Sequence, residues 1–170
     1  MLKQKIFSRD LFKKVRLNGW LIAGFLGVLI LTYLILVNGR QWRRFGELEI
    51  GEKRYHVIYS ITAKDRQQGL SDRTEIGADG MVFINPRQEQ SQFWMYHMLF
   101  PLDFVWVAEG KVVDLHENVQ HPSNQNDILR VSPNQPVDMV IEFPSGTIDR
   151  ENIVIGTPVD RVLNWYYALW

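Results

Sequence analysis

An uncharged run of 23 residues, Leu17 to Gly39, divides this 170-residue chain into two unlike parts. Within the run, Trp20 to Val37 is almost wholly apolar, and Thr32 is its only clearly polar member. At about 1.5 Å per residue, a helix of this length spans roughly 34 Å, enough to cross a bilayer core of about 30 Å. A cleaved signal peptide is the alternative, but its apolar core is usually shorter and ends in small residues. The run therefore predicts a retained transmembrane helix over residues 17–39.

Basic residues on the two sides of this run predict its orientation. Six precede it and three follow it closely, namely Lys3, Lys5, Arg9, Lys13, Lys14 and Arg16 against Arg40, Arg43 and Arg44. The excess on the first side favours a cytoplasmic N-terminus. We therefore expect a basic cytoplasmic flank over 1–16, a linker over 40–46, and a domain over 47–170 on the periplasmic or extracellular side. The membrane is then a partner through residues 17–39.

The charge of the following domain excludes one class of partner. From Phe45 onward the chain carries 10 basic and 18 acidic residues, a net charge of −8, although the whole chain is formally neutral. An acidic surface disfavours nucleic acid, whose phosphates require a basic face. The chain has no cysteine, which excludes disulfides, thiolate metal sites and cysteine nucleophiles. The predicted partner is therefore a protein or a small polar ligand, and no cofactor is predicted.

Alternation of apolar and polar residues predicts a β-rich domain. The patterns favour strands at 47–50, 54–61, 81–84, 91–96, 102–108, 111–115, 137–143 and 159–163. Asn85-Pro86 is expected to end the third of these strands, and Glu109-Gly110 to form a tight hairpin.

Two short helical segments and one long loop complete this prediction. Thr62 and Asp65 are typical of a helix start, and Gly69 of a helix end, so a helix is expected over 63–68. A helical turn is expected near 147–152, and the polar segment 117–135 reads as a long loop. The fold class is therefore α+β and β-rich, a small barrel-like domain with one or two short helices.

Several separated motifs resemble those of one bacterial and archaeal family. They are Arg66-Gln67-Gln68-Gly69-Leu70 with Arg73, Gly80-Met81-Val82-Phe83, Phe93-Trp94-Met95, Pro101-Leu102-Asp103, Ser132-Pro133, Val140-Ile141-Glu142 and Gly146. In this order and spacing they resemble the domain of unknown function 192 family over residues 55–163. The resemblance implies a small β-rich fold, often exported behind a signal or anchor, and supplies no substrate. Where the family usually has lysine-asparagine-threonine after tryptophan-methionine, this chain has Tyr96-His97-Met98. Any ligand role of that lysine or asparagine is then changed or lost here.

The two apolar runs around Pro101 contain the best candidate pocket. Aromatic, imidazole and carboxyl groups close to the joint of two strands suit a small polar ligand such as a sugar or a peptide end. The candidate residues are Trp94, Met95, His97, Asp103 and His116. A purely structural role is the alternative, in which Phe93, Met95, Phe104 and Trp106 form core and Asp103 caps backbone amides. An unpaired buried carboxylate is too costly to keep, so Asp103 must be exposed or paired.

Other chemistries have weaker support. His97, Asp103, His116, Glu117 and His121 have suitable metal-ligand types, but no metal-binding spacing occurs among them, so no metal is predicted. Arg66 and Arg73 flank a glycine turn and are candidates for binding an anion, or for pairing with nearby acids. The aromatic tail Trp165 to Trp170 is expected to complete the core, rest on the membrane or dock a partner.

Three functions are therefore open. The first is a membrane-anchored extracytoplasmic module that binds a small ligand or a partner, with Trp94, His97 and Asp103 around its pocket. The second is a hydrolase that uses Asp103 with His97 or His116 as acid and base. The third is a structural subunit of a membrane complex.

Overall fold

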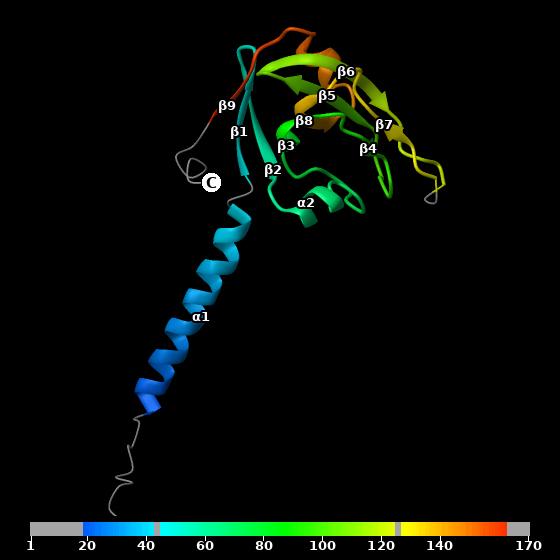
Figure 1. The fold of residues 1–170 in the computed structure, drawn as a ribbon. Coiled ribbons are helices and arrows are strands. Elements are labelled where there is room, and N and C mark those ends of the chain that lie inside the picture. Colours follow the sequence, from blue (N-terminus) through cyan, green and yellow to red (C-terminus); the bar gives the residue numbers. More distant parts are fainter. Residues whose placement is uncertain (1–18, 43–44, 125–126, 163–170) are drawn as a thin grey trace, which may run out of the picture. The chain divides into compact units, whose positions relative to one another are not determined.

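The computed structural model describes residues 19–42, 45–124 and 127–162, and the chain divides into two units after Arg40 (Figure 1). Helix α1 (Gly19–Trp42) covers most of the segment predicted as a transmembrane helix. In the part of the chain that the structure describes, no helix combines the length and the apolar character that crossing a membrane requires. The predicted basic flank 1–16 and the aromatic tail 165–170 lie outside the described residues.

The second unit is built on one sheet of seven strands. In chain order they are β1 (Phe45–Ile50), β2 (Lys53–Ser60), β3 (Gly80–Glu89), β5 (Leu102–Ala108), β6 (Lys111–Val119), β8 (Val137–Pro144) and β9 (Val159–Val162). Their order across the sheet is β6-β5-β8-β3-β2-β1-β9. Only the pair β2–β3 is parallel among these neighbours, and helix α2 (Ala63–Gln68) lies in the crossover between them.

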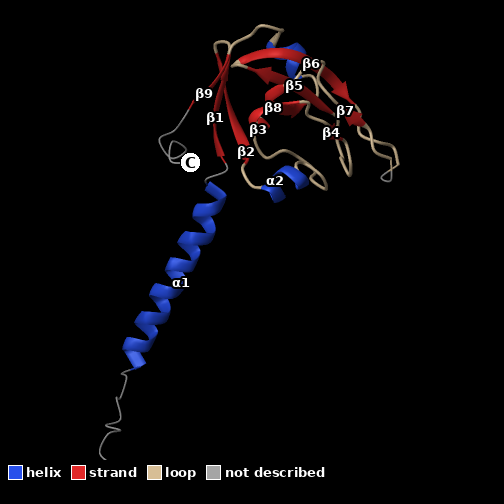
Figure 2. Cartoon of the chain, viewed as in Figure 1, coloured by secondary structure: helices blue, strands red, loops and turns tan. Residues whose placement is uncertain are grey.

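The sheet is curled into a half-barrel, which Figure 2 shows as a bent layer of strands. Its two outermost strands, β6 and β9, approach each other at one end. Lys111 of β6 forms an isolated bridge with Pro158, directly before β9. The backbone N–H of Val112 donates to the Thr157 carbonyl at 2.9 Å, and that of Val159 donates to the Gly110 carbonyl at 2.9 Å. These contacts close the curl at that end.

Apolar side chains cover both faces of the sheet. Every residue of β5 is buried, so this central strand packs on both sides. One face holds a first core cluster that includes Val57, Val82, Val105, Ile141 and Phe143. The other face holds a second core cluster that includes Leu70, Met81, Phe83, Met95, Phe104, Trp106 and Val140. The second core cluster is the side on which the candidate site lies.

Two smaller elements flank the sheet. Strands β4 (Phe93–Trp94) and β7 (Arg130–Val131) form a separate antiparallel pair, and helix α3 (Thr147–Glu151) follows β8. β7 lies inside the segment 117–135 that was predicted to be only a loop, and β6 reaches Val119. Those two features correct the prediction for this segment.

Most of the predicted elements are present, with two further corrections. The helix at 63–68 is confirmed, because the Thr62 hydroxyl accepts from Asp65 N and the Asp65 carboxylate accepts from Thr62 N. Strand β3 does not end at Asn85-Pro86 but continues to Glu89 across an irregular register. The strand expected over 91–96 is reduced to Phe93–Trp94. A β-rich α+β fold with a curled, half-closed sheet and few short helices is confirmed.

Candidate functional site

Glu142 of β8 is a carboxyl group buried between apolar strands. Its neighbours Ile141 and Phe143 face the first core cluster, so Glu142 points to the opposite face. Across the sheet it is paired with Phe104 of β5 on one side and with Met81 of β3 on the other. The residue is 5% exposed, and Oε2 has no hydrogen-bond partner among the described residues.

Burial changes the protonation of this carboxyl. Loss of solvation raises the pKa of Glu142 from its ordinary 4.5 to about 8. At neutral pH the group is therefore mainly protonated and carries an O–H donor. A buried polar group without a partner costs about 1–3 kcal/mol, so its presence points to a use other than stability.

Glu142 lines a cavity of about 370 Å³, here called the inner cavity. The cavity lies between α2 with the turn that follows it, the second half of β3, and β4. Side-chain amides are frequent in its wall, which includes Gln67, Gln68, Asn85, Gln90 and Gln92. Amides both donate and accept hydrogen bonds, so the inner cavity is polar without being strongly charged.

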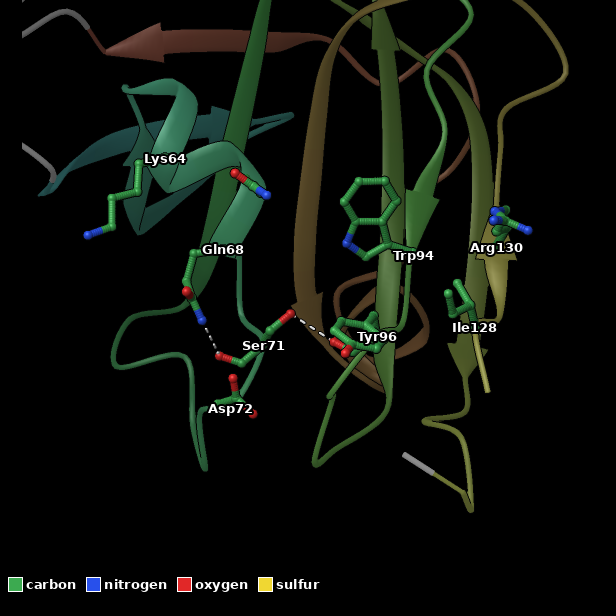
Figure 3. Close-up of a pocket in the computed structure, with 9 residues that line it drawn as sticks. Lys64, Gln68, Ser71, Asp72, Trp94, Tyr96, Ile128 and Arg130 are labelled. Carbon is green, nitrogen blue, oxygen red and sulfur yellow. Dashed lines mark hydrogen bonds between the residues drawn. The ribbon is translucent and has the colours of Figure 1, made fainter. Parts of the chain in front are cut away.

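A second cavity, the outer cavity, has a volume of about 590 Å³, and its lining residues are drawn in Figure 3. Lys64 and Gln68 of α2 lie on one side of it, and Trp94, Ile128 and Arg130 lie on the other. Gln67, Gln68, Ser71 and Trp94 line both cavities, so the two lie side by side. We call the two cavities together the cleft.

The aromatic core determines how Trp94 is presented. The preceding residue, Phe93, packs edge-on against Phe83 and Trp106, with ring centroids 4.9 and 5.6 Å apart. Because successive side chains of a strand point to opposite sides, Trp94 points away from these rings and is 46% exposed. Pairing of β4 with β7 places Arg130 opposite Trp94. The cleft thus has a fixed aromatic wall.

Residues 47–161 match the DUF192 family, which is described as an uncharacterized ACR. This chain belongs to the DUF192 family. The match covers most of the chain and confirms the resemblance expected from the separated motifs. No curated protein matches the chain.

Two solved structures are similar to this DUF192 chain. A Sinorhizobium meliloti protein, named as a proposed transcription regulator, is 25% identical, with a TM-score of 0.59 over 69% of this chain and 93% of that one. A Novosphingobium aromaticivorans protein of unknown function is 24% identical, with a TM-score of 0.59 over 68% of this chain and 84% of that one. Both support the fold of the DUF192 domain.

Of the predicted pocket residues in the DUF192 domain, Trp94 lies at the cleft and Met95 lies in the core. Trp94 lines both cavities of the cleft. Met95 is fully buried in the second core cluster, as are Phe104 and Trp106. For these three apolar residues the structure matches the structural alternative, in which they form core.

His97 lies against residues that line the outer cavity. Its Nδ1 lies 3.0 Å from Asp72 Oδ1, and its ring stacks on Tyr96 with centroids 4.0 Å apart. Asp72 N donates to the His97 carbonyl at 2.9 Å, and Ser71 Oγ donates to the Tyr96 carbonyl at 2.8 Å. Asp72, Ser71 and Tyr96 all line the outer cavity. His97 thus ties together two loops that border the cleft.

Asp103 lies on the opposite face of the sheet, where its carboxylate is bonded to backbone amides. It is fully buried, and its carboxylate accepts from Asn118 N at 2.8 Å and from Ile148 N, in the first turn of α3, at 2.9 Å. His116 is paired with Phe104, the residue after Asp103, so the two side chains face opposite sides. His116 Nδ1 accepts from Trp106 Nε1 at 2.8 Å. The structure does not bring Asp103 together with His116, and it pairs His97 with Asp72 instead.

The predicted anion-binding arginines are also separated. Arg66 lines the inner cavity, and its Nη1 donates to the Ile61 carbonyl at 3.1 Å. Arg73 lines a different cavity, of about 220 Å³, and its Nη1 lies 3.5 Å from the Ile76 carbonyl. Among the described residues, no group of three or more histidine, aspartate or glutamate side chains is placed to hold a metal ion.

Glu142 was missed as a functional residue, although one sequence signal indicates it. It is the only charged residue in the otherwise apolar run Val140 to Phe143. An acid at such a position must be paired, protonated or used. The amides of α2 and of the segment after β3 had no such signal, because only the fold brings them together.

Proposed function

We propose that the DUF192 domain is a binding module whose cleft takes up a small polar ligand. The observation that carries the proposal is the position of Glu142 in the wall of the inner cavity, where Oε2 is buried without a hydrogen-bond partner among the described residues and burial raises the pKa of the carboxyl to about 8. Oε2 itself is closed off from solvent, so a ligand atom would have to displace part of the cavity wall to supply the missing hydrogen bond. The two cavities together have the size and the mixture of aromatic and polar walls that small-molecule sites usually have.

The rest of the cleft supports binding rather than the predicted hydrolase. Asp103, which that reaction needs, faces away from the cleft and has both carboxylate oxygens bonded to backbone amides. The Sinorhizobium protein is named for transcription, but the net charge of −8 after residue 44 disfavours DNA as a partner here. A binding role uses Trp94, Glu142 and the side-chain amides, which do line the cleft.

A fragment screen tests the proposal. We expect that, among amino acids, dipeptides, nucleosides, polyols and monosaccharides, at least one compound binds the full chain in saturation-transfer NMR. Its signal should fall to about half or less in Trp94→Ala, because the exposed ring supplies contact area. Ile155→Ala, an exposed apolar change outside the cleft, is the matched control. If no compound distinguishes Trp94→Ala from this control, the cleft is not a ligand site.

We also propose that residues 17–39 anchor the module in a membrane with the domain on the outer side. The proposal rests on the sequence, in which 23 residues carry no charge and most basic residues precede them. The described residues themselves show no helix that meets the requirement for a membrane crossing.

Reporter fusions test this topology. Alkaline phosphatase fused after Trp170 is expected to be active, and green fluorescent protein fused there to be dark, since each reporter works on only one side of the bacterial inner membrane. Neutralising Lys13 and Lys14 should reduce the phosphatase activity, because it lowers the excess of basic residues before the run. Release of the chain from membranes by high salt or carbonate would contradict the anchor.

A further inference from the structure

We propose that the ligand of the cleft is a neutral carbohydrate, a short saccharide that packs a ring on Trp94 and places hydroxyl groups against Glu142 and the amides of the inner cavity. This inference rests on the proposed binding function and gives it a ligand class. Five features of the cleft support it: the aromatic wall, the oriented amides, the Glu142 carboxyl, the balance of charge and the size.

The aromatic wall suits the apolar face of a sugar ring. Trp94 is 46% exposed and Tyr96 is 40% exposed, and both line the outer cavity. Large exposed aromatic rings inside a cavity offer a flat apolar surface with little rotational freedom to lose. The C–H groups on one face of a pyranose ring form a matching flat apolar surface. Trp94 therefore has the form of a stacking platform.

The amides of the inner cavity are held in fixed orientations. Gln68 Nε2 donates to the Ser71 carbonyl at 3.0 Å, Asn85 Nδ2 to Ser91 Oγ at 2.9 Å, and Gln90 Nε2 to the Pro133 carbonyl at 2.6 Å. Each of these bonds uses one of the two N–H donors of the amide, so the carbonyl oxygen and the second N–H remain for a ligand. Such preorganised groups lower the cost of binding.

Glu142 supplies the complementary donor. Its carboxyl, whose pKa burial raises to about 8, lines the same cavity as these amides. A sugar hydroxyl both donates and accepts, so one hydroxyl can donate to an amide oxygen and accept from Glu142. An anionic ligand group has no proton to give to the amide oxygens, and an ammonium group cannot accept from Glu142.

The formal charges in the cleft also favour a neutral ligand. In the inner cavity Arg66 and Glu89 have opposite charges. In the outer cavity Asp72 lies with Lys64 and Arg130. An ionic ligand would be expected to bind between walls of the opposite charge, and neither cavity has charged residues of one sign only.

The size of the cleft also suits a short saccharide. The two neighbouring cavities, of about 370 and 590 Å³, leave room for more than one sugar ring.

Calorimetric titration with defined saccharides tests the proposal. The probes are neutral trisaccharides of α- and β-linked glucose, galactose, mannose and N-acetylglucosamine. The full chain is held in lipid nanodiscs, because sugar-based detergents would compete. We expect at least one trisaccharide to bind, and Trp94→Ala to weaken it about tenfold or more. Phe45→Leu, which removes an exposed aromatic ring elsewhere in the domain, should bind as the wild type does.

A pH series separates a ligand contact of Glu142 from a structural effect. Affinity of the wild type should fall by about tenfold between about pH 6 and pH 9, as Glu142 loses the donated proton. Glu142→Gln keeps a donor and an acceptor at every pH, so it should bind with an affinity that changes little over this range. Equal pH dependence in the wild type and Glu142→Gln would overturn the assigned role.

The outcomes also distinguish this inference from the proposed function. If no trisaccharide binds but other polar fragments still give signals that depend on Trp94, the carbohydrate class is wrong and the binding function stands. If neither saccharides nor fragments bind, both are wrong. Binding that is unchanged in Trp94→Ala would place the saccharide elsewhere and overturn the inference.

Discussion

Glu142→Gln is expected to stabilise the domain at about pH 9 by roughly 3 to 5 kcal/mol while leaving its stability almost unchanged near pH 4. The pKa of Glu142 is about 8 in the folded protein against an ordinary 4.5. Below about pH 4.5 the carboxyl is protonated in both states and costs nothing by ionising. Between about pH 4.5 and pH 8 the unfolded chain gives up the proton more readily, so the free energy of unfolding of the wild type decreases. The amide does not titrate and removes this decrease.

Urea denaturation of the full chain, followed by tryptophan fluorescence over this pH range, measures the effect. The informative quantity is the difference in the free energy of unfolding between variant and wild type, because contributions of the other titrating groups cancel in it. Glu117→Gln, a substitution of an exposed glutamate on β6, is the matched control. A constant difference for Glu142→Gln would mean that the carboxyl is charged in the folded protein.

Asp103→Asn is expected to destabilise the domain by roughly 2 to 4 kcal/mol, because a fully buried carboxylate loses one of two charge-assisted hydrogen bonds. Its two oxygens accept from Asn118 N and Ile148 N, at 2.8 and 2.9 Å. The amide has only one oxygen, so its NH₂ group would face a backbone N–H that also donates. One buried donor is then left without an acceptor.

The same denaturation experiment measures this loss, with Asp160→Asn on β9 as an exposed control. Fragment binding by Asp103→Asn, measured at a temperature where it is folded, should equal that of the wild type, since Asp103 lies on the opposite face from the cleft. A variant of unchanged stability that no longer binds would contradict the structural role and restore Asp103 as a site residue.

Elements that depend on neighbours in the chain could be predicted from the sequence. The helix at 63–68 follows from Thr62 and Asp65, which form a reciprocal pair of hydrogen bonds, and from Gly69, which has a φ of +50°. The hairpin at Glu109-Gly110 follows from two residues that adopt positive φ. In both places a few adjacent residues contain all of the information.

Elements that depend on distant partners could not be predicted. β3 continues past Pro86 because Glu89 pairs with Val137, on a strand almost fifty positions later. β7 is a strand only because Arg130 and Val131 meet β4. The polar composition of the surrounding segment gives no sign of this pairing, so a loop was the natural interpretation.

The candidate site depends on both kinds of information. Trp94 was predicted as a pocket residue because an aromatic residue beside a strand end is visible in the sequence, and it lines the cleft. For Asp103 the sequence was compatible with exposure or with burial beside partners, and the structure shows it with two backbone partners. The pKa of Glu142 is raised because Phe104 and Met81 come from two other strands, a consequence of sheet order that periodicity does not contain.

The bridge between Lys111 and Pro158 also bears on association between copies of the domain. An open sheet has two edge strands whose unpaired N–H and C=O groups can template the addition of a strand from another molecule. Here Gly156 N donates to the Val112 carbonyl, and Val112 N donates to the Thr157 carbonyl, so part of the β6 edge is already occupied. Curling therefore protects this sheet against edge-to-edge aggregation by a means that needs no charged residue on the strand.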